Sequence, residues 1–186
     1  MPDSPVGAAL ARDGMTVVAV RPVSAAAAAL ARPVGAAPFP ADDLLCLPQP
    51  LAAAAAPPGV PALCAALAEL LRAEKVRLSE VVPARFDYPG SCIAERVAVT
   101  QARVGEPTPY DEARRHGTSF LSRRRAFVLN ADHPVVRDLA ALAAREPELA
   151  AYLAAKLFFL GPDLDPQRDA RLAGRATEAR CRRRTA

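Results

Sequence analysis

The side chains that could carry acid, base or nucleophilic chemistry are few in this sequence. It contains two histidines, His116 and His133. A hydrolytic triad would have to combine His133 with the adjacent Asp132 and with Ser119 or Ser122. Neighbouring residues point in different directions, however, and no G-x-S-x-G turn is present to expose a serine. We therefore interpret Asp132 and His133 as candidate structural caps, whose side-chain acceptors stabilise the start of a helix.

The cysteines offer no metal or redox motif. Cys46, Cys64, Cys92 and Cys181 are far apart and form no C-x-x-C pair, which excludes a zinc ribbon and a thioredoxin-type motif. Cys92 follows a glycine turn and could be a nucleophile with His133 as its base, but buried strand cysteines are common and inert. We expect free thiols in a reducing compartment, and no catalytic residue, metal site or cofactor.

Arginine is the remaining residue type that could bind a ligand. The sequence has no G-x-x-x-x-G-K-[ST] and no G-x-G-x-x-G pattern, but arginine presents a planar fork of donors to phosphate. From Arg168 onward seven arginines oppose two acidic residues, so the formal charge of +4 resides in the tail. The alternative interpretation is solvated charge that keeps the protein soluble. The candidate contacts for an anion or nucleic acid are Arg123, Arg124, Arg125, Arg180, Arg182, Arg183 and Arg184.

The first arginine cluster leads into the most strongly patterned part of the chain. Ala126–Leu129 is a short apolar run, typical of a strand buried on both faces. The pattern then predicts one helix over Pro134–Arg145 and a second over Pro147–Leu160, because proline fits the first helical turn. In the second helix, leucines at three- and four-residue spacing predict the buried stripe: Leu149, Leu153, Leu157 and Leu160.

The other elements are predicted from similar patterns. Pro61–Lys75 is a one-sided helix with leucines on one face. Pro89-Gly90-Ser91 is typical of a type II turn, because its second central position needs a positive φ, and we expect a hairpin or adjoining antiparallel strands around it. The remaining expectations are a strand at Met15–Arg21, a strand at Val76–Val82, a polar loop at 104–122 with a helical turn near Asp111–His116, and an exposed, frayed helix at Pro166–Arg183.

Composition supports one globular domain. The chain has 186 residues, of which 52% are hydrophobic and 24% charged. Its arginine-rich, lysine-poor composition is typical of a GC-rich bacterial genome. We predict an α+β fold, with a small mixed or antiparallel sheet and a C-terminal helical pair or triplet. The expected organisation is a mobile lead at 1–14, one domain at 15–162 with a proline-rich connection at 32–61, and a basic helix or tail at 163–186.

One segment resembles a known superfamily. Phe127-Val-Leu-Asn-Ala-Asp-His-Pro-Val-Val136, an apolar strand followed by N-x-x-H-P and a helix, is similar to the later part of some bacterial GHKL ATPase proteins, the group of gyrase, histidine kinases and a dimeric chaperone. The resemblance covers residues 126–160. It lacks the superfamily's ATP-site helix and Asp-x-Gly-x-Gly loop, so it implies an accessory or C-terminal module without a catalytic residue.

These observations lead to two functional hypotheses. The first is a non-catalytic interaction or accessory module that acts with a larger protein partner of the chaperone or ATPase-associated kind, or with a second copy of itself. The alternative is binding of nucleic acid or another acidic surface through the basic tail. We expect no membrane contact, because charges and prolines interrupt Met15–Ala37 well below the ~18 unbroken apolar residues of a membrane span. The expected location is the cytoplasm.

Overall fold

The main sheet is organised around one strand. The computed structural model describes residues 4–18, 24–26, 28–29, 41–114, 125–158 and 165–184. Strand β6 (Arg125–Asn130) lies at the centre, and all of its residues are buried, as a continuous apolar run predicts. It is parallel to one neighbour and antiparallel to the other. The strand order is β2-β3-β6-β4, with bounds β2 (Gln49–Pro50), β3 (Leu78–Arg85) and β4 (Ala98–Gln101).

The predicted fold class is confirmed. The main sheet is mixed, and two further short strands, β1 (Leu45–Cys46) and β5 (Thr108–Pro109), form a separate antiparallel pair. Three helices follow β6 along the chain. The protein is therefore α+β, with a small mixed sheet and a C-terminal helical triplet.

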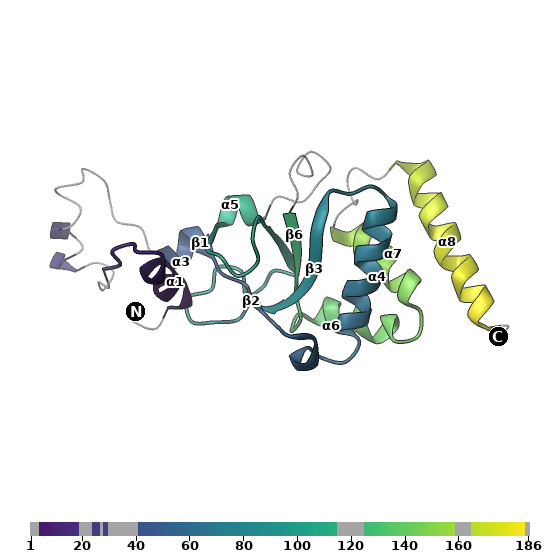
Figure 1. The fold of residues 1–186 in the computed structure, drawn as a ribbon, viewed down its shortest axis with the longest axis horizontal. Coiled ribbons are helices and arrows are strands. Elements are labelled where there is room, and N and C mark those ends of the chain that lie inside the picture. The colour runs from purple at the N-terminus through teal and green to yellow at the C-terminus, as the bar shows by residue number, and fades with distance from the viewer. Residues whose placement is uncertain are drawn as a thin grey trace.

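One face of the main sheet is covered by helices (Figure 1). These are α4 (Val60–Ala73), α6 (Pro134–Ala143) and α7 (Pro147–Phe158). The predicted leucine face of α4 is confirmed, because Leu63, Leu67 and Leu71 are fully buried against Phe127 and Leu129 of β6. Burying a leucine side chain contributes about 1.5–3 kcal/mol, so this layer is the main core.

The opposite face carries a second, smaller core. Short helices lie on it: α1 (Pro5–Arg12), α3 (Ala41–Leu44) and α5 (Tyr110–Ala113). A 3₁₀ turn, η1 (Ala53–Ala55), lies between β2 and α4 along the chain. The buried side chains of this second core include Phe86, Ile93 and Val128. Alternate residues of β6 therefore serve the two cores, as the period of a strand requires.

The expectations for the N-terminal segment were wrong where the structure describes it. Within the mobile lead predicted at 1–14, the described residues 4–14 contain a packed helix: Ser4 caps α1 by accepting a hydrogen bond from the Gly7 amide at 3.3 Å, and Val6 is fully buried. Met15–Val18 is exposed and forms no strand. Residues with strand propensity need a neighbouring strand to pair with, and none pairs with these four. The rest of the predicted strand, 19–21, lies outside the described residues.

The turn at Pro89-Gly90 has the predicted form, but the hairpin prediction was wrong. The Ser91 amide donates to the Tyr88 carbonyl at 3.0 Å and Gly90 has a φ of 82°, as a type II turn requires. The strands β3 and β4 do not pair with each other, because β6 lies between them. The more apolar β6 takes the fully buried central position, which leaves the two sequence neighbours on either side.

The predicted leucine stripe of α7 was wrong in part, since Leu149 and Leu153 pack half-buried against the main core but do not form the most buried face. The buried residues of α7 are Tyr152 and the alanines Ala150, Ala151, Ala154 and Ala155, whereas Leu157 is 60% exposed. The helix contacts α4, α6 and α8. Small side chains let several helices approach one central helix closely, so alanines take the inner positions. The predicted end at Leu160 lies outside the described residues.

The C-terminal helix is packed rather than exposed and frayed. Asp165 caps the start of helix α8 (Pro166–Arg184). Its side chain accepts hydrogen bonds from the amides of Gln167 and Arg168, each at 3.0 Å. The helix packs on α7 through Leu172, Ala176 and Ala179, at the end of the molecule opposite α1 (Figure 1). This apolar contact is small, and ion pairs described below add to it.

Candidate functional site

The environment of the candidate nucleophile Cys92 favours the protonated thiol over the thiolate. Its thiol donates to the Leu45 carbonyl at 3.4 Å, and burial raises its pKa above the ordinary value. Burial also raises the pKa values of Cys46 and Cys64 to about 12, and the four cysteines are free thiols. Because the thiolate is the nucleophile, the geometry does not favour nucleophilic chemistry at Cys46, Cys64 or Cys92.

The residues of the imagined triad have other partners. His133 is the N-cap of α6, and its Nδ1 accepts the amide of Val135 at 3.2 Å. Asp132 pairs with Arg85 at 3.4 Å and with Arg137 at 3.1 Å, so its carboxylate orients surface arginines and is not the cap. The other predicted members, Ser119, Ser122 and His116, lie outside the described residues.

Arg125, the last residue of the first arginine cluster, is not exposed to solvent. Arg125 is 5% exposed; its guanidinium donates to the Glu112 carboxylate and to the Thr100 carbonyl at 3.0 Å. A phosphate in solvent cannot reach a side chain used inside the fold, so the prediction that Arg125 contacts an anion was wrong. Arg123 and Arg124 lie outside the described residues.

The tail arginines face acidic residues at the start of α7, one just before the helix and one in its first turn. Arg180 pairs with Glu146 at 3.2 Å, and Arg183 pairs with Glu148. Arg182 lines a groove described below, and the side chain of Arg184 lies outside the described part. The charge that the sequence concentrates in the tail is thus partly neutralised by residues distant along the chain.

A single glutamate holds the other end of α8. Glu74 is the C-cap of α4, and its side chain is 4% exposed. Its oxygens accept from Arg168 at 2.9 Å and from both terminal nitrogens of Arg171 at 2.8 Å, while Arg175 lies 3.8 Å away. These bonds, led by those of Arg171, lower the Glu74 pKa against the opposing effect of burial. We call this cluster, Glu74 with Arg168, Arg171 and Arg175, the arginine clasp.

The backbone after α4 positions the clasp. Lys75 has a φ of 59°, and the amides of Lys75 and Val76 donate to the carbonyls of Arg72 and Leu71 at 3.0 and 2.9 Å. This is a Schellman ending, in which a left-handed residue reverses the chain. Because the helix stops there, Glu74 projects its carboxylate toward α8 and the chain turns back into β3.

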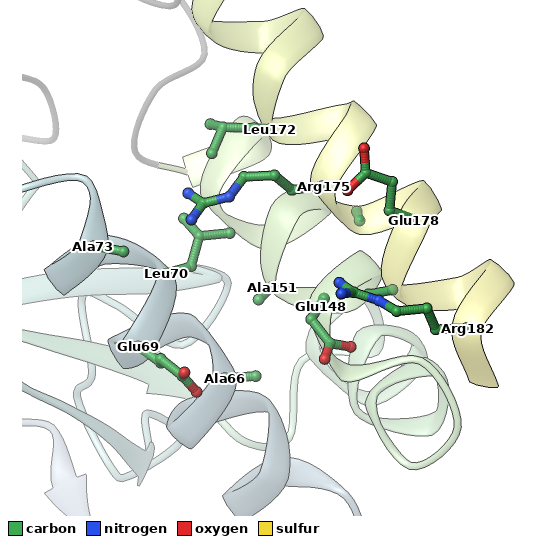
Figure 2. A pocket seen from close by; sticks show the side chains of 12 residues that line it. Ala66, Glu69, Leu70, Ala73, Glu148, Ala151, Leu172, Arg175, Glu178 and Arg182 are labelled. Carbon is green, nitrogen blue, oxygen red and sulfur yellow. The ribbon is translucent and has the colours of Figure 1, made fainter. Parts of the chain in front are cut away.

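Between the clasp and the far end of α8 lies a groove of about 390 Å³ (Figure 2). Its walls are α4 and α8 and its floor is α7, with Ala151 at the bottom. We call it the α4/α8 groove. Its lining is mostly small or apolar: Ala66, Leu70 and Ala73 from α4, Ala151 from α7, and Leu172, Ala176 and Ala179 from α8.

Charges stand on the rim of the groove. Arg175 extends from α8 over Leu70 toward α4, and Arg182 extends toward Glu148 at the other end (Figure 2). Glu69 stands exposed on the α4 wall. The α4/α8 groove is therefore apolar at its floor and charged at its rim, the division that protein-binding surfaces share. No sequence pattern predicts this groove, because the alanines that line it carry no functional group.

The described residues offer no alternative site of a recognised kind. Among them no group of three or more His, Cys, Asp or Glu side chains could hold a metal ion. No helix within the described ranges has the length and apolar character needed to cross a membrane. Comparison of the chain with protein-family models, with curated proteins and with solved structures finds no match.

Proposed function

We propose that this protein is a non-catalytic interaction module that binds a larger protein partner in the α4/α8 groove. The observation that carries the proposal is the groove itself, a concave surface with an alanine floor and a charged rim. Binding surfaces of proteins combine a desolvated apolar centre with a polar edge that excludes water. Alanines on the floor leave room for a partner's side chains, which would supply most of the buried area.

The state of the reactive side chains supports a binding role over catalysis. The thiols of Cys46 and Cys92 have raised pKa values, and His133 uses one ring nitrogen as a helix cap. A general base or nucleophile needs a pKa near the working pH and a free reacting atom. The described groups are committed to the fold instead.

The class of partner is proposed from the resemblance to GHKL ATPase proteins. That resemblance covers β6, α6 and α7, and α7 contributes the floor of the α4/α8 groove. An accessory module would place this surface against the ATPase or chaperone subunit with which it works. Homo-oligomerisation is the other form of the proposal, and light scattering of the purified chain separates the two.

A photo-crosslinking experiment tests the groove. A benzophenone amino acid replaces Glu69 on the groove rim in one variant and the exposed Glu80 of β3 in a control. In cells of the source organism we expect one defined crosslinked protein from position 69 only. Ala66→Arg, which fills the groove, should abolish that crosslink, whereas Ala65→Arg on the exposed side of α4 should not. Equal crosslinking from both positions, or none from position 69, would refute the proposal.

Binding of nucleic acid or another acidic surface by the tail is the second proposal. It is favoured by the arginine clasp, where three guanidinium groups share one carboxylate. It is opposed by the pairing of Arg180 and Arg183 with glutamates. Counterion release makes such binding fall steeply with salt, so a mobility shift that stays constant between low and moderate salt would remove this proposal.

A further inference from the structure

The shape of the α4/α8 groove limits what could occupy it. Both walls are helices, and the floor helix α7 contacts each of them. The arginine clasp joins the walls at one end, and the lining extends along α8 from Leu172 to Arg182 (Figure 2). An elongated surface between two helices, with a floor of small side chains, matches an amphipathic helix laid lengthwise. Its volume of about 390 Å³ accommodates a few side chains of that helix.

The charges on the rim define two different flanks: the α8 side carries Arg175, Arg182 and Glu178, a net positive charge, and the α4 side carries Glu69. On the α8 side, Arg175 lies 3.8 Å from Oε1 of Glu74, beyond hydrogen-bond distance, and that oxygen accepts from Arg171 while Oε2 accepts from Arg168 and Arg171. Its side chain is 62% exposed and makes no hydrogen bond to a described residue. The Arg175 guanidinium therefore retains its donors at the groove edge. An arginine fork with free donors binds carboxylates well.

The α4 side of the groove has the opposite charge. Glu69 is exposed there, one helical turn from Ala66 and Ala73. A ligand with one uniform charge would be attracted to one rim and repelled by the other. An occupant whose two flanks carry opposite charges would instead be attracted on both sides and held in one direction.

We propose that the occupant is an amphipathic α-helix of the protein partner, with small apolar residues on its seated face, a carboxylate toward Arg175 and a basic residue toward Glu69. This inference rests on the proposed function and adds the partner's chemistry and direction. Failure of every helical peptide to bind, together with self-association of the purified chain in light scattering, would instead assign the groove to a second copy.

The test uses a displayed library of 18-residue helical peptides. Seated positions are restricted to Ala, Ser and Leu, and each flank varies among Glu, Lys and Gln. The library is sorted for binding to the labelled full-length chain, with counter-selection against Ala66→Arg. We expect enrichment of Glu on one flank and Lys on the other. Failure to enrich any sequence, or enrichment without a charge difference between the flanks, would overturn the inference.

Charge reversal then identifies the contacts. Arg175→Glu should weaken an enriched peptide roughly 2- to 5-fold or more, the range of an exposed ion pair, and a peptide with Lys in place of its Glu should recover that loss. Arg103→Glu, on the exposed loop after β4, is the matched control and should change nothing. An equal loss in both variants would refute a contact with Arg175.

The two proposals fail in different ways. If the benzophenone at position 69 crosslinks a partner in cells but no helical peptide is enriched, the module binds through its groove and the proposal of a helical occupant is wrong. If enriched peptides bind but no partner is crosslinked, the α4/α8 groove accepts helices and the proposed cellular function is wrong. Melting curves of Ala66→Arg and Arg175→Glu that match wild type would show that the fold is intact in both variants.

Discussion

Replacing Glu74 with glutamine should release α8 while leaving the sheet and α4 folded. Glutamine keeps the shape of the side chain, but its amide turns donors toward the arginines of the clasp. Glu74 accepts three hydrogen bonds from Arg168 and Arg171 at 2.8–2.9 Å, and a bond to a charged group contributes ~1.5–3 kcal/mol. Arg171 is half exposed, so solvent screening lowers the sum.

Apart from the clasp, α8 is held by the partly exposed pairs of Asp169, Arg180 and Arg183 and by a small apolar contact. Leu172 and two alanines, Ala176 and Ala179, are its buried apolar residues among those described. We expect Glu74→Gln to cost about 2–3 kcal/mol of α8 docking. Because each 1.4 kcal/mol is a factor of ten, amides of α8 should exchange with solvent deuterium roughly 30- to 140-fold faster.

Hydrogen–deuterium exchange measured by mass spectrometry checks this prediction. Glu80→Gln, an exposed glutamate of β3, is the matched control and should leave α8 unchanged. Unaltered protection of α8 in Glu74→Gln would refute the reasoning. So would an equal loss of protection in β6, because Glu74 would then support the whole fold and not the docking of one helix.

Acid should have the same effect on the wild-type protein. The hydrogen bonds of the clasp lower the Glu74 pKa, so its contribution is complete above the ordinary value of ~4.3 and is lost as the pH falls through the lower folded value. Asp169, whose pKa is lowered by its bond to Lys156, acts in the same direction on α8. Protection of α8 should therefore fall below about pH 4, whereas the Glu74 part of that change should be missing from Glu74→Gln.

Three further substitutions, tested by thermal melting, address local features of the backbone and of a helix cap. Gly59→Ala should cost about 2–5 kcal/mol, because a Cβ there would lie 2.3 Å from the Ala140 carbonyl oxygen and φ is 80°; Gly105→Ala has the same φ without that clash, and an equal cost would refute the close approach. Lys75→Gly should raise stability by up to ~1 kcal/mol by relieving its left-handed φ, and a lower melting temperature would contradict this. His133→Ala should cost ~0.5–2 kcal/mol as a lost cap; loss of partner binding with an unchanged melting curve would instead assign His133 to a site.

Local patterns predicted the elements whose residues decide their own structure. The apolar run of β6, the leucine face of α4 and the Pro89-Gly90 turn each depend on a few adjacent side chains. Strand pairing was not predictable in this way, because it depends on segments that are distant in the sequence. In the sheet, β6 lies between β3 and β4 and pairs with both. Pattern reasoning ranks leucine above alanine, but α7 places alanines inside because three helices meet there.

The candidate site was hidden for a related reason. Glu74 and Arg171 are 97 positions apart, so no local spacing links them. The sequence pattern of the α8 arginines predicts either an anion-binding tail or a solvated one, because the glutamates that pair with them come from other elements. The α4/α8 groove is lined by alanines, which are abundant throughout the chain. Only the docking of α8 gives Arg175 and Glu69 a shared surface.

The central place of β6 has a consequence for how the chain folds during synthesis. Every other strand of the main sheet precedes β6 in sequence, and both β3 and β4 pair with it. The ribosome therefore releases the leucine face of α4 and the edges of β3 and β4 before their partner exists. Such unpaired, apolar segments are where nascent chains aggregate or meet chaperones. A ribosome stalled shortly before residue 125 should hold a protease-sensitive chain, and one stalled well after residue 158 a resistant one.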